Sequence, residues 1–175
     1  SPRDGLQAEE RILPTETKIA LIDRLADAGH TVIETTSFVS PKAVPQLADA
    51  DELFKRLRQR SGVRYPVLVP NERGLERALA GGANEIAIVA SASESYSRRN
   101  LGRSRAEARE MLRPVARRAK DQGMRMRAYL SMAFVDPWDG PTRLDVAVDA
   151  GRALLDLGAD ELSIGDTIGA ATPGK

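Results

Sequence analysis

The sequence contains no cysteine and only one histidine, His30. The missing thiols exclude a disulfide framework and a metal site built on thiolates. No apolar run reaches the length of about 18 residues that a membrane-spanning helix needs. We therefore expect no membrane partner and an intracellular protein. Chemistry that needs several histidines must draw them from outside these 175 residues.

An excess of charge of one sign is also missing, because 26 basic residues are balanced by 25 acidic ones. Arginine outnumbers lysine 21 to 5, but the arginines are spread along the chain. This spread is typical of a solvated surface and predicts no nucleic-acid partner. With 42% hydrophobic residues, the chain has the composition of an ordinary globular protein, and we expect a single domain over residues 1–175.

Short β-branched apolar runs alternate with longer segments of helical periodicity, the pattern of βαβ units that build a parallel sheet. Three segments repeat one design, in which a helix ends at a glycine and a strand follows: DRLADAGHTVIET, ERALAGGANEIAI and RALLDLGADELSI. The expected strands are Thr31–Ser37, Arg64–Val69, Glu85–Ala90, Met124–Ser131 and Glu161–Gly165.

Parallel βα units form either a closed barrel or an open doubly wound sheet, and no glycine-rich GxGxxG loop follows these strands. The barrel is therefore favoured. A complete (β/α)8 barrel takes roughly 250 residues, whereas this chain supplies five strands, and Ser1-Pro2-Arg3 reads as the end of a sixth. We predict an α/β fold that covers the first five to six units of a TIM (β/α)8 barrel.

Polar residues at strand exits are the site candidates, because a barrel builds its active site at the carboxyl ends of its strands. Arg3 and Asp4 place a cation beside a carboxylate, although a surface ion pair would look the same. Glu34 shares strand parity with inward residues, where an unpaired acid would be costly, and its partner is either Arg3 or a substrate-activating water. Ser37 has the opposite parity, and Asp166 suits a helix cap as well as catalysis.

Longer motifs carry a resemblance to a known family. The run Pro2-Arg3-Asp4-Gly5-Leu6-Gln7, followed by Lys18, resembles the opening signature of acyl-CoA lyases and Claisen-type synthases built on metal-dependent barrels. The runs VIETTSFVSPKAVPQLAD (Val32–Asp49), YPVLVPN (Tyr65–Asn71) and LSIGDTIGAATPG (Leu162–Gly174) resemble the 3-hydroxy-3-methylglutaryl-CoA lyase family in particular.

The resemblance implies an enzyme that cleaves 3-hydroxy-3-methylglutaryl-CoA to acetyl-CoA and acetoacetate with Mg²⁺ or Mn²⁺, as in leucine degradation and ketone-body formation. It implies catalytic roles for Arg3, Glu34 and Asp166, substrate contacts from Gln7 and Ser37, and a metal ligand in Asp4. A His-X-His pair and an Asn beyond residue 175 would complete the metal site. It further implies an acyl-CoA substrate, a homodimer, and a cytoplasmic or mitochondrial location, of which we predict the cytoplasm.

One segment departs from the family pattern. Where close relatives read roughly SCALGCPYEG, this chain reads SMAFVDPWDG over residues 131–140, without either cysteine. A reshaped acyl pocket and a different 3-hydroxyacyl-CoA substrate follow as one reading. Two other hypotheses stay open: a synthase of the isopropylmalate or citramalate type that runs the condensation, and a non-catalytic barrel fragment that serves as a binding or scaffold module.

Overall fold

The computed structural model describes residues 1–172, which fall into two compact units, Ser1–Ala87 and Ile88–Lys175. The first unit contains α1 (Pro2–Gln7), α2 (Thr15–Asp27), the 3-10 helix η1 (Pro45–Leu47), α3 (Ala50–Arg56), β1 (Val67–Leu68) and α4 (Glu72–Ala80). The second contains α5 (Glu94–Leu101), α6 (Arg105–Asp121), β3 (Arg125–Ser131), β4 (Val135–Asp136), β5 (Gly140–Pro141), α7 (Leu144–Asp156) and β6 (Glu161–Ile164). Strand β2 (Glu85–Ser91) crosses the boundary between them.

The chain begins with a short helix. The prediction that Ser1-Pro2-Arg3 ends a strand is wrong, because Pro2 and Arg3 lie in the first turn of α1. Ser1 is the N-cap, and its hydroxyl accepts a bond from the Asp4 amide. Proline suits the first helical position because its fixed φ is already helical and no amide hydrogen is needed there.

The predicted strand over residues 31–37 is extended but is not a regular strand, since only Val32 and Ser37 form bridges, to Arg64 and Leu68. The Thr35 amide donates to the Pro66 carbonyl at 3.1 Å. Pro66 has no amide hydrogen to return, so the ladder is interrupted in its middle. β1, which pairs in parallel with β2, is shortened accordingly to Val67–Leu68.

The first unit closes around an apolar core. Its buried side chains come from α2, from the extended segment and from the helices and strands that follow it: Ile22, Ile33, Leu47, Leu53, Val67, Leu75 and Ile86. The glycines of the repeated design take the conformation expected after a helix, with φ of 90° at Gly29 and 82° at Gly82.

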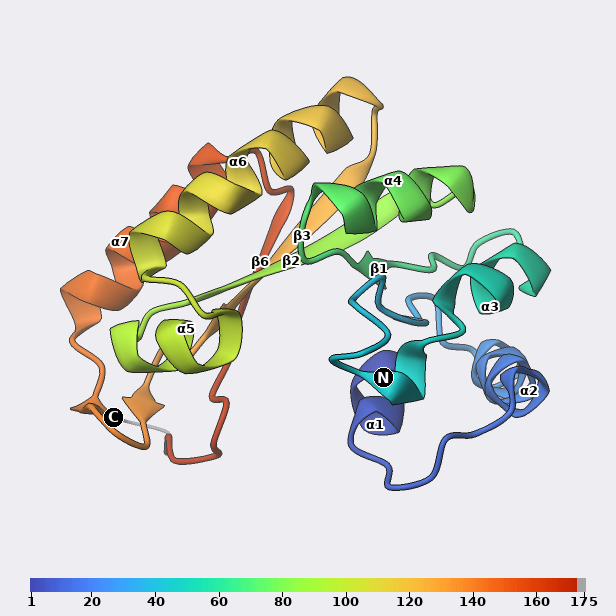
Figure 1. Ribbon diagram of the computed structural model, residues 1–175, viewed down its shortest axis with the longest axis horizontal. Helices are drawn as coiled ribbons and strands as arrows, with labels where there is room; N and C mark the ends of the chain where they lie inside the picture. The colour runs from blue at the N-terminus through green and yellow to red at the C-terminus, as the bar shows by residue number, and fades with distance from the viewer. Residues whose placement is uncertain (173–175) are drawn as a thin grey trace. The chain divides into compact units, whose positions relative to one another are not determined.

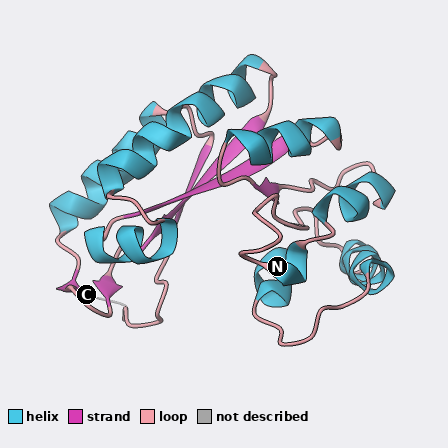
Figure 2. Ribbon diagram, viewed as in Figure 1, coloured by secondary structure: helices cyan, strands magenta, loops and turns pink. Residues whose placement is uncertain are grey.

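In the second unit β3 and β6 pair in parallel, with Arg127 opposite Glu161 and Leu130 opposite Ile164. Helices α6 and α7 run alongside one another next to these strands (Figure 1). Colouring by secondary structure shows the same arrangement (Figure 2). α6 starts at a capping box, in which Ser104 and Glu107 satisfy each other's backbone amides.

One element was not foreseen. β4 and β5 form a small antiparallel hairpin around Pro137–Asp139, in the segment that departs from the family pattern. The other pairings described here, β1 with β2 and β3 with β6, are parallel. Among the residues the structure describes, no helix has the length and apolar character needed to cross a bilayer.

Candidate active site

Arg3 is fixed between two carboxylates. Its Nε donates to Glu34 Oε1 at 2.8 Å, and its Nη1 donates to Asp4 Oδ1 at 3.2 Å. The Arg3 amide also donates to the Glu34 carbonyl at 3.1 Å, so the first turn of α1 is attached to the extended segment through main chain and side chain. The guanidinium side chain is 14% exposed, which leaves a mostly buried cation with a set direction.

Glu34 is buried, at 5% exposure, and meets the cation that its parity required. The prediction that Arg3 is its partner is confirmed. An unpaired carboxylate at this depth would be strongly disfavoured. The pair therefore holds both side chains in one geometry.

Asp4 and Gln7 lie on the outer side of α1. The Asp4 side chain is 75% exposed, and its single described contact is with Arg3 through Oδ1. Oδ2 is left able to bind a hard cation, which prefers carboxylate oxygen. Gln7 is exposed, and its side chain makes no hydrogen bond with the described residues. Among residues 1–172 no three His, Cys, Asp or Glu side chains gather into a metal site, so Asp4 fits as one ligand of an incomplete set.

Three consecutive hydroxyls are buried beside this pair without a hydrogen-bond partner in the described chain: Thr35, Thr36 and Ser37. Ser37 is only 1% exposed. A buried hydroxyl without a partner costs free energy of about 1–3 kcal/mol, which a ligand or an ordered water can relieve. Ser37, predicted to contact substrate, is thus a polar group still able to bond.

Asp166 belongs to the second unit, where it follows β6. Its two carboxylate oxygens accept bonds from the amides of Ala170 and Ala171, at 3.0 and 2.8 Å. It therefore shapes the turn after β6 and caps no helix there, because no helix follows β6 within the described residues. Pro173 and Gly174, which end the LSIGDTIGAATPG motif, lie outside the described residues.

A buried ion pair that sequence reasoning missed supports the loop after Ser37. Lys18 Nζ donates to Asp49 Oδ1 and to the Gln46 carbonyl, both at 2.6 Å. Asp49 precedes α3, but its side chain makes no capping bond there and accepts from Thr15 Oγ1 at 2.8 Å. The only sequence signal was the spacing of Thr15 and Lys18, which puts both side chains on one face of α2.

The divergent hairpin is tied to the start of α5 by carboxylates. Asp136 is buried and accepts bonds from the amides of Trp138 and Asp139. Burial by itself would raise the pKa of Asp136, but the Ser93 hydroxyl, the two amides and the charge of Arg99 outweigh it and hold the pKa below its ordinary value. Asp139 in turn accepts a bond from Ser95 Oγ at 2.7 Å.

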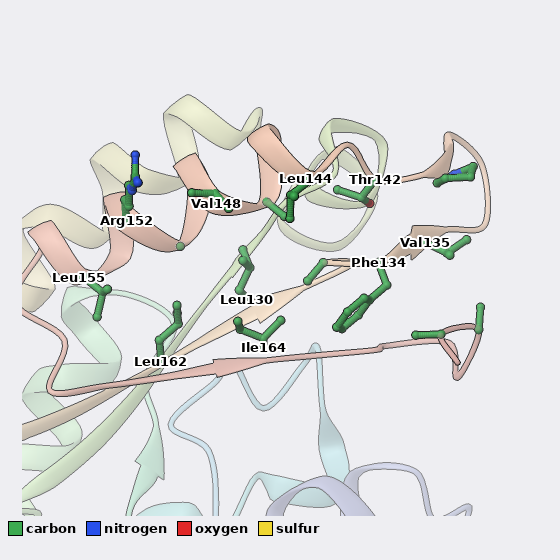
Figure 3. A pocket seen from close by; sticks show the side chains of 16 residues that line it. Leu130, Phe134, Val135, Thr142, Leu144, Val148, Arg152, Leu155, Leu162 and Ile164 are labelled. Carbon is green, nitrogen blue, oxygen red and sulfur yellow. The ribbon is translucent and has the colours of Figure 1, made fainter. Parts of the chain in front are cut away.

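A cavity in the second unit does not suit a charged substrate. It runs along α7 and β6, with a volume of about 720 Å³, and Leu130, Leu144, Val148, Leu162 and Ile164 point into it (Figure 3). Arg152 is its only ionisable lining residue. This cavity therefore offers no set of polar groups for a thioester carrying carboxylate and phosphates.

Comparison with known proteins gives a consistent result along the whole chain. A family model described as HMGL-like matches residues 1–175. The chain is 46% identical over 174 residues to the 3-hydroxy-3-methylglutaryl-CoA lyase, cytoplasmic, of Danio rerio, covering 99% of this chain and 52% of that protein. It is 44% identical over 173 residues to the mitochondrial hydroxymethylglutaryl-CoA lyase of Rattus norvegicus, covering 99% and 53%.

Solved structures agree. The HMG-CoA lyase from Brucella melitensis superposes with a TM-score of 0.96 at 49% identity, covering 98% of this chain and 61% of that one. An HMG-CoA lyase from Acinetobacter baumannii in complex with coenzyme A and 3-methylmalate gives 0.94 at 33% identity, covering 99% and 56%. The predicted α/β barrel class is confirmed, and the chain spans about half the length of the curated relatives it matches.

Proposed function

Because the chain belongs to the HMGL-like family, we propose that its protein cleaves 3-hydroxy-3-methylglutaryl-CoA to acetyl-CoA and acetoacetate. The observation that carries the proposal is Arg3, a largely buried guanidinium held between Glu34 and Asp4. The supporting relatives named above are lyases acting on this thioester.

In this reaction a base removes the proton of the tertiary hydroxyl, and the electrons left on oxygen form the new ketone of acetoacetate. The bond between the second and third carbons breaks, and its electron pair passes to the thioester as an enolate. Protonation of that enolate gives acetyl-CoA. Formation of the enolate is the step that most needs electrostatic stabilisation, because negative charge develops on its oxygen.

Arg3 is the group suited to that charge. Glu34 holds its Nε and so sets the direction of the guanidinium, which we propose donates to the developing oxyanion without reorganising during the reaction. Ser37 supplies a buried hydroxyl for orienting the substrate, and we assign Gln7 the same kind of role at the exposed side of α1. Asp166 lies in the second unit, in the turn after β6, and its catalytic role stays a prediction.

Asp4 would hold the divalent cation through Oδ2, with the remaining ligands from outside the described residues. A hard ion such as Mg²⁺ or Mn²⁺, when bound, polarises the substrate hydroxyl and carboxylate. The homodimer stays a prediction. The cytoplasmic location also stays one, because the named relatives include both cytoplasmic and mitochondrial proteins.

The test replaces Arg3 by lysine in the complete protein. An ammonium keeps the charge but loses the planar fork of donors, so we expect kcat to fall by about 100-fold or more, in the range seen when an oxyanion donor is removed. Arg58→Lys, at an exposed arginine of the same unit, is the matched control. Near-normal turnover of Arg3→Lys, or wild-type cleavage that ignores a chelator, would contradict the proposal.

A further inference from the structure

A basic groove lies in the first unit, at the end of the segment that carries Ser37. It has a volume of about 720 Å³ and is bounded by the loop after Phe38 and by α4. Three cations line it, Lys42, Arg73 and Arg77, against one carboxylate, Asp51. The arginines are spread evenly along the sequence, so the sequence alone does not indicate that these three cations line one groove.

Arg77 is already engaged in holding the groove together. Its Nε donates to both oxygens of Asp51, at 3.1 and 3.0 Å, and its Nη1 donates to the Val39 carbonyl at 3.1 Å. Its guanidinium also lies 5.3 Å from the centre of the Phe38 ring. Arg77 and Asp51 therefore neutralise each other and form a fixed wall.

Lys42 and Arg73 are different. Both are exposed, and neither makes an ion pair or a side-chain hydrogen bond with any part of the chain that the structure describes. Two uncompensated cations thus face one cavity. Ser40 and Asn71, also in the lining, add polar side chains beside them.

Gly74 explains how close the two walls lie. A Cβ at this position would stand 2.8 Å from the Phe38 carbonyl oxygen and 3.0 Å from Pro70 Cδ. Only a glycine lets the first turn of α4 approach the loop so closely. The close packing of α4 against the loop that bounds the groove therefore depends on Gly74.

We propose that Lys42 and Arg73 bind the phosphate groups of the coenzyme A part of the substrate. This inference rests on the proposed function, which requires a CoA thioester. Coenzyme A carries a 3′-phosphate and a diphosphate, anions that lysine and arginine recognise through charge and hydrogen bonds. Lys42 is five residues beyond Ser37, so an extended chain places it at most about 18 Å away, a span suited to the long pantetheine arm.

The experiment measures binding by calorimetry to the complete protein, with no turnover needed. The variants are Lys42→Glu/Arg73→Glu and, as the charge-matched control outside the groove, Arg58→Glu. The probes are coenzyme A, dephospho-coenzyme A, pantetheine and inorganic phosphate. Thermal unfolding of each variant checks that the fold is kept, and Lys42→Gln/Arg73→Gln serves as a milder pair if charge reversal unfolds the protein.

We expect the double reversal to raise the Kd for coenzyme A at least tenfold, with Arg58→Glu within twofold of wild type and the affinity for pantetheine unmoved. A smaller loss with dephospho-coenzyme A would place the 3′-phosphate in the groove. Unchanged coenzyme A affinity in the folded double variant overturns the proposal, as does binding of inorganic phosphate that coenzyme A does not displace. Binding of coenzyme A is measured without cleavage, so the two proposals can fail separately. A wild-type protein that binds coenzyme A through Lys42 and Arg73 but cleaves no substrate would refute the lyase function alone.

Discussion

The buried ion pair of Lys18 and Asp49 offers the sharpest stability test. Lys18→Met keeps the aliphatic stem, which packs in the first unit, and removes only the ammonium. Lys18 is 1% exposed and bonds both the Asp49 carboxylate and the Gln46 carbonyl. The substitution would leave a carboxylate and a carbonyl without their donor.

The size of the effect follows from how each orphaned group is placed. Removing one partner of a buried pair costs about 3–5 kcal/mol in general. Asp49 keeps its bond from Thr15 and is 19% exposed, so water relieves part of the loss. We therefore expect the low end, about 3 kcal/mol in the free energy of unfolding.

Urea denaturation of the complete protein measures this directly. With a slope of about 2 kcal/mol per M, the midpoint should fall by about 1.5 M. Lys55→Met, at an exposed lysine of α3, is the control and should shift stability by less than about 0.5 kcal/mol. A loss below about 1 kcal/mol for Lys18→Met would show that the pair does not stabilise the fold as reasoned here.

Three further outcomes can be checked. Gly74→Ala gains about 1 kcal/mol of helix propensity, but its Cβ would lie 2.8 Å from a backbone oxygen, an overpacking that costs about 1–3 kcal/mol; a raised melting temperature would contradict the net loss. Ser104→Ala removes the capping box of α6 and should cost about 1 kcal/mol, with Ser104→Thr as the control that retains a hydroxyl; equal melting temperatures would count against it. Hydrogen bonds from Lys120 and the Met126 amide hold the pKa of Asp160 below its ordinary 3.8, so its contribution is present above that value and lost as the pH falls through the folded-state pKa. Asp160→Asn should flatten the acid side of a plot of unfolding free energy against pH, and an unchanged slope would refute the assignment.

Sequence reasoning succeeded where a pattern fixes a direction. The parity of Glu34 put its carboxylate inside and called for a cation, and Arg3 meets it. The alternation of apolar runs with helical segments likewise located the strands β2, β3 and β6 to within a residue at each end. In both cases the local period decides which face is buried.

It failed where the partner is distant or local chemistry overrides the pattern. Lys18 and Asp49 are 31 positions apart, and periodicity identifies a buried face without naming what lies across from it. Pro66 interrupts the pairing of the extended segment, because a missing amide outweighs a favourable run of β-branched residues. Lys42 and Arg73 meet in one groove only because α4 folds back against the loop.

The hairpin of β4 and β5 is held by carboxylates and contains no thiol, so thiol reagents cannot modify it. Its anchors are the carboxylates of Asp136 and Asp139, and the 175 residues offer no sulfhydryl for alkylation or oxidative cross-linking. Iodoacetamide therefore finds no thiol to alkylate within these 175 residues, and peroxide finds none to oxidise. Any thiol labelling of a protein that contains this sequence would report on residues outside it.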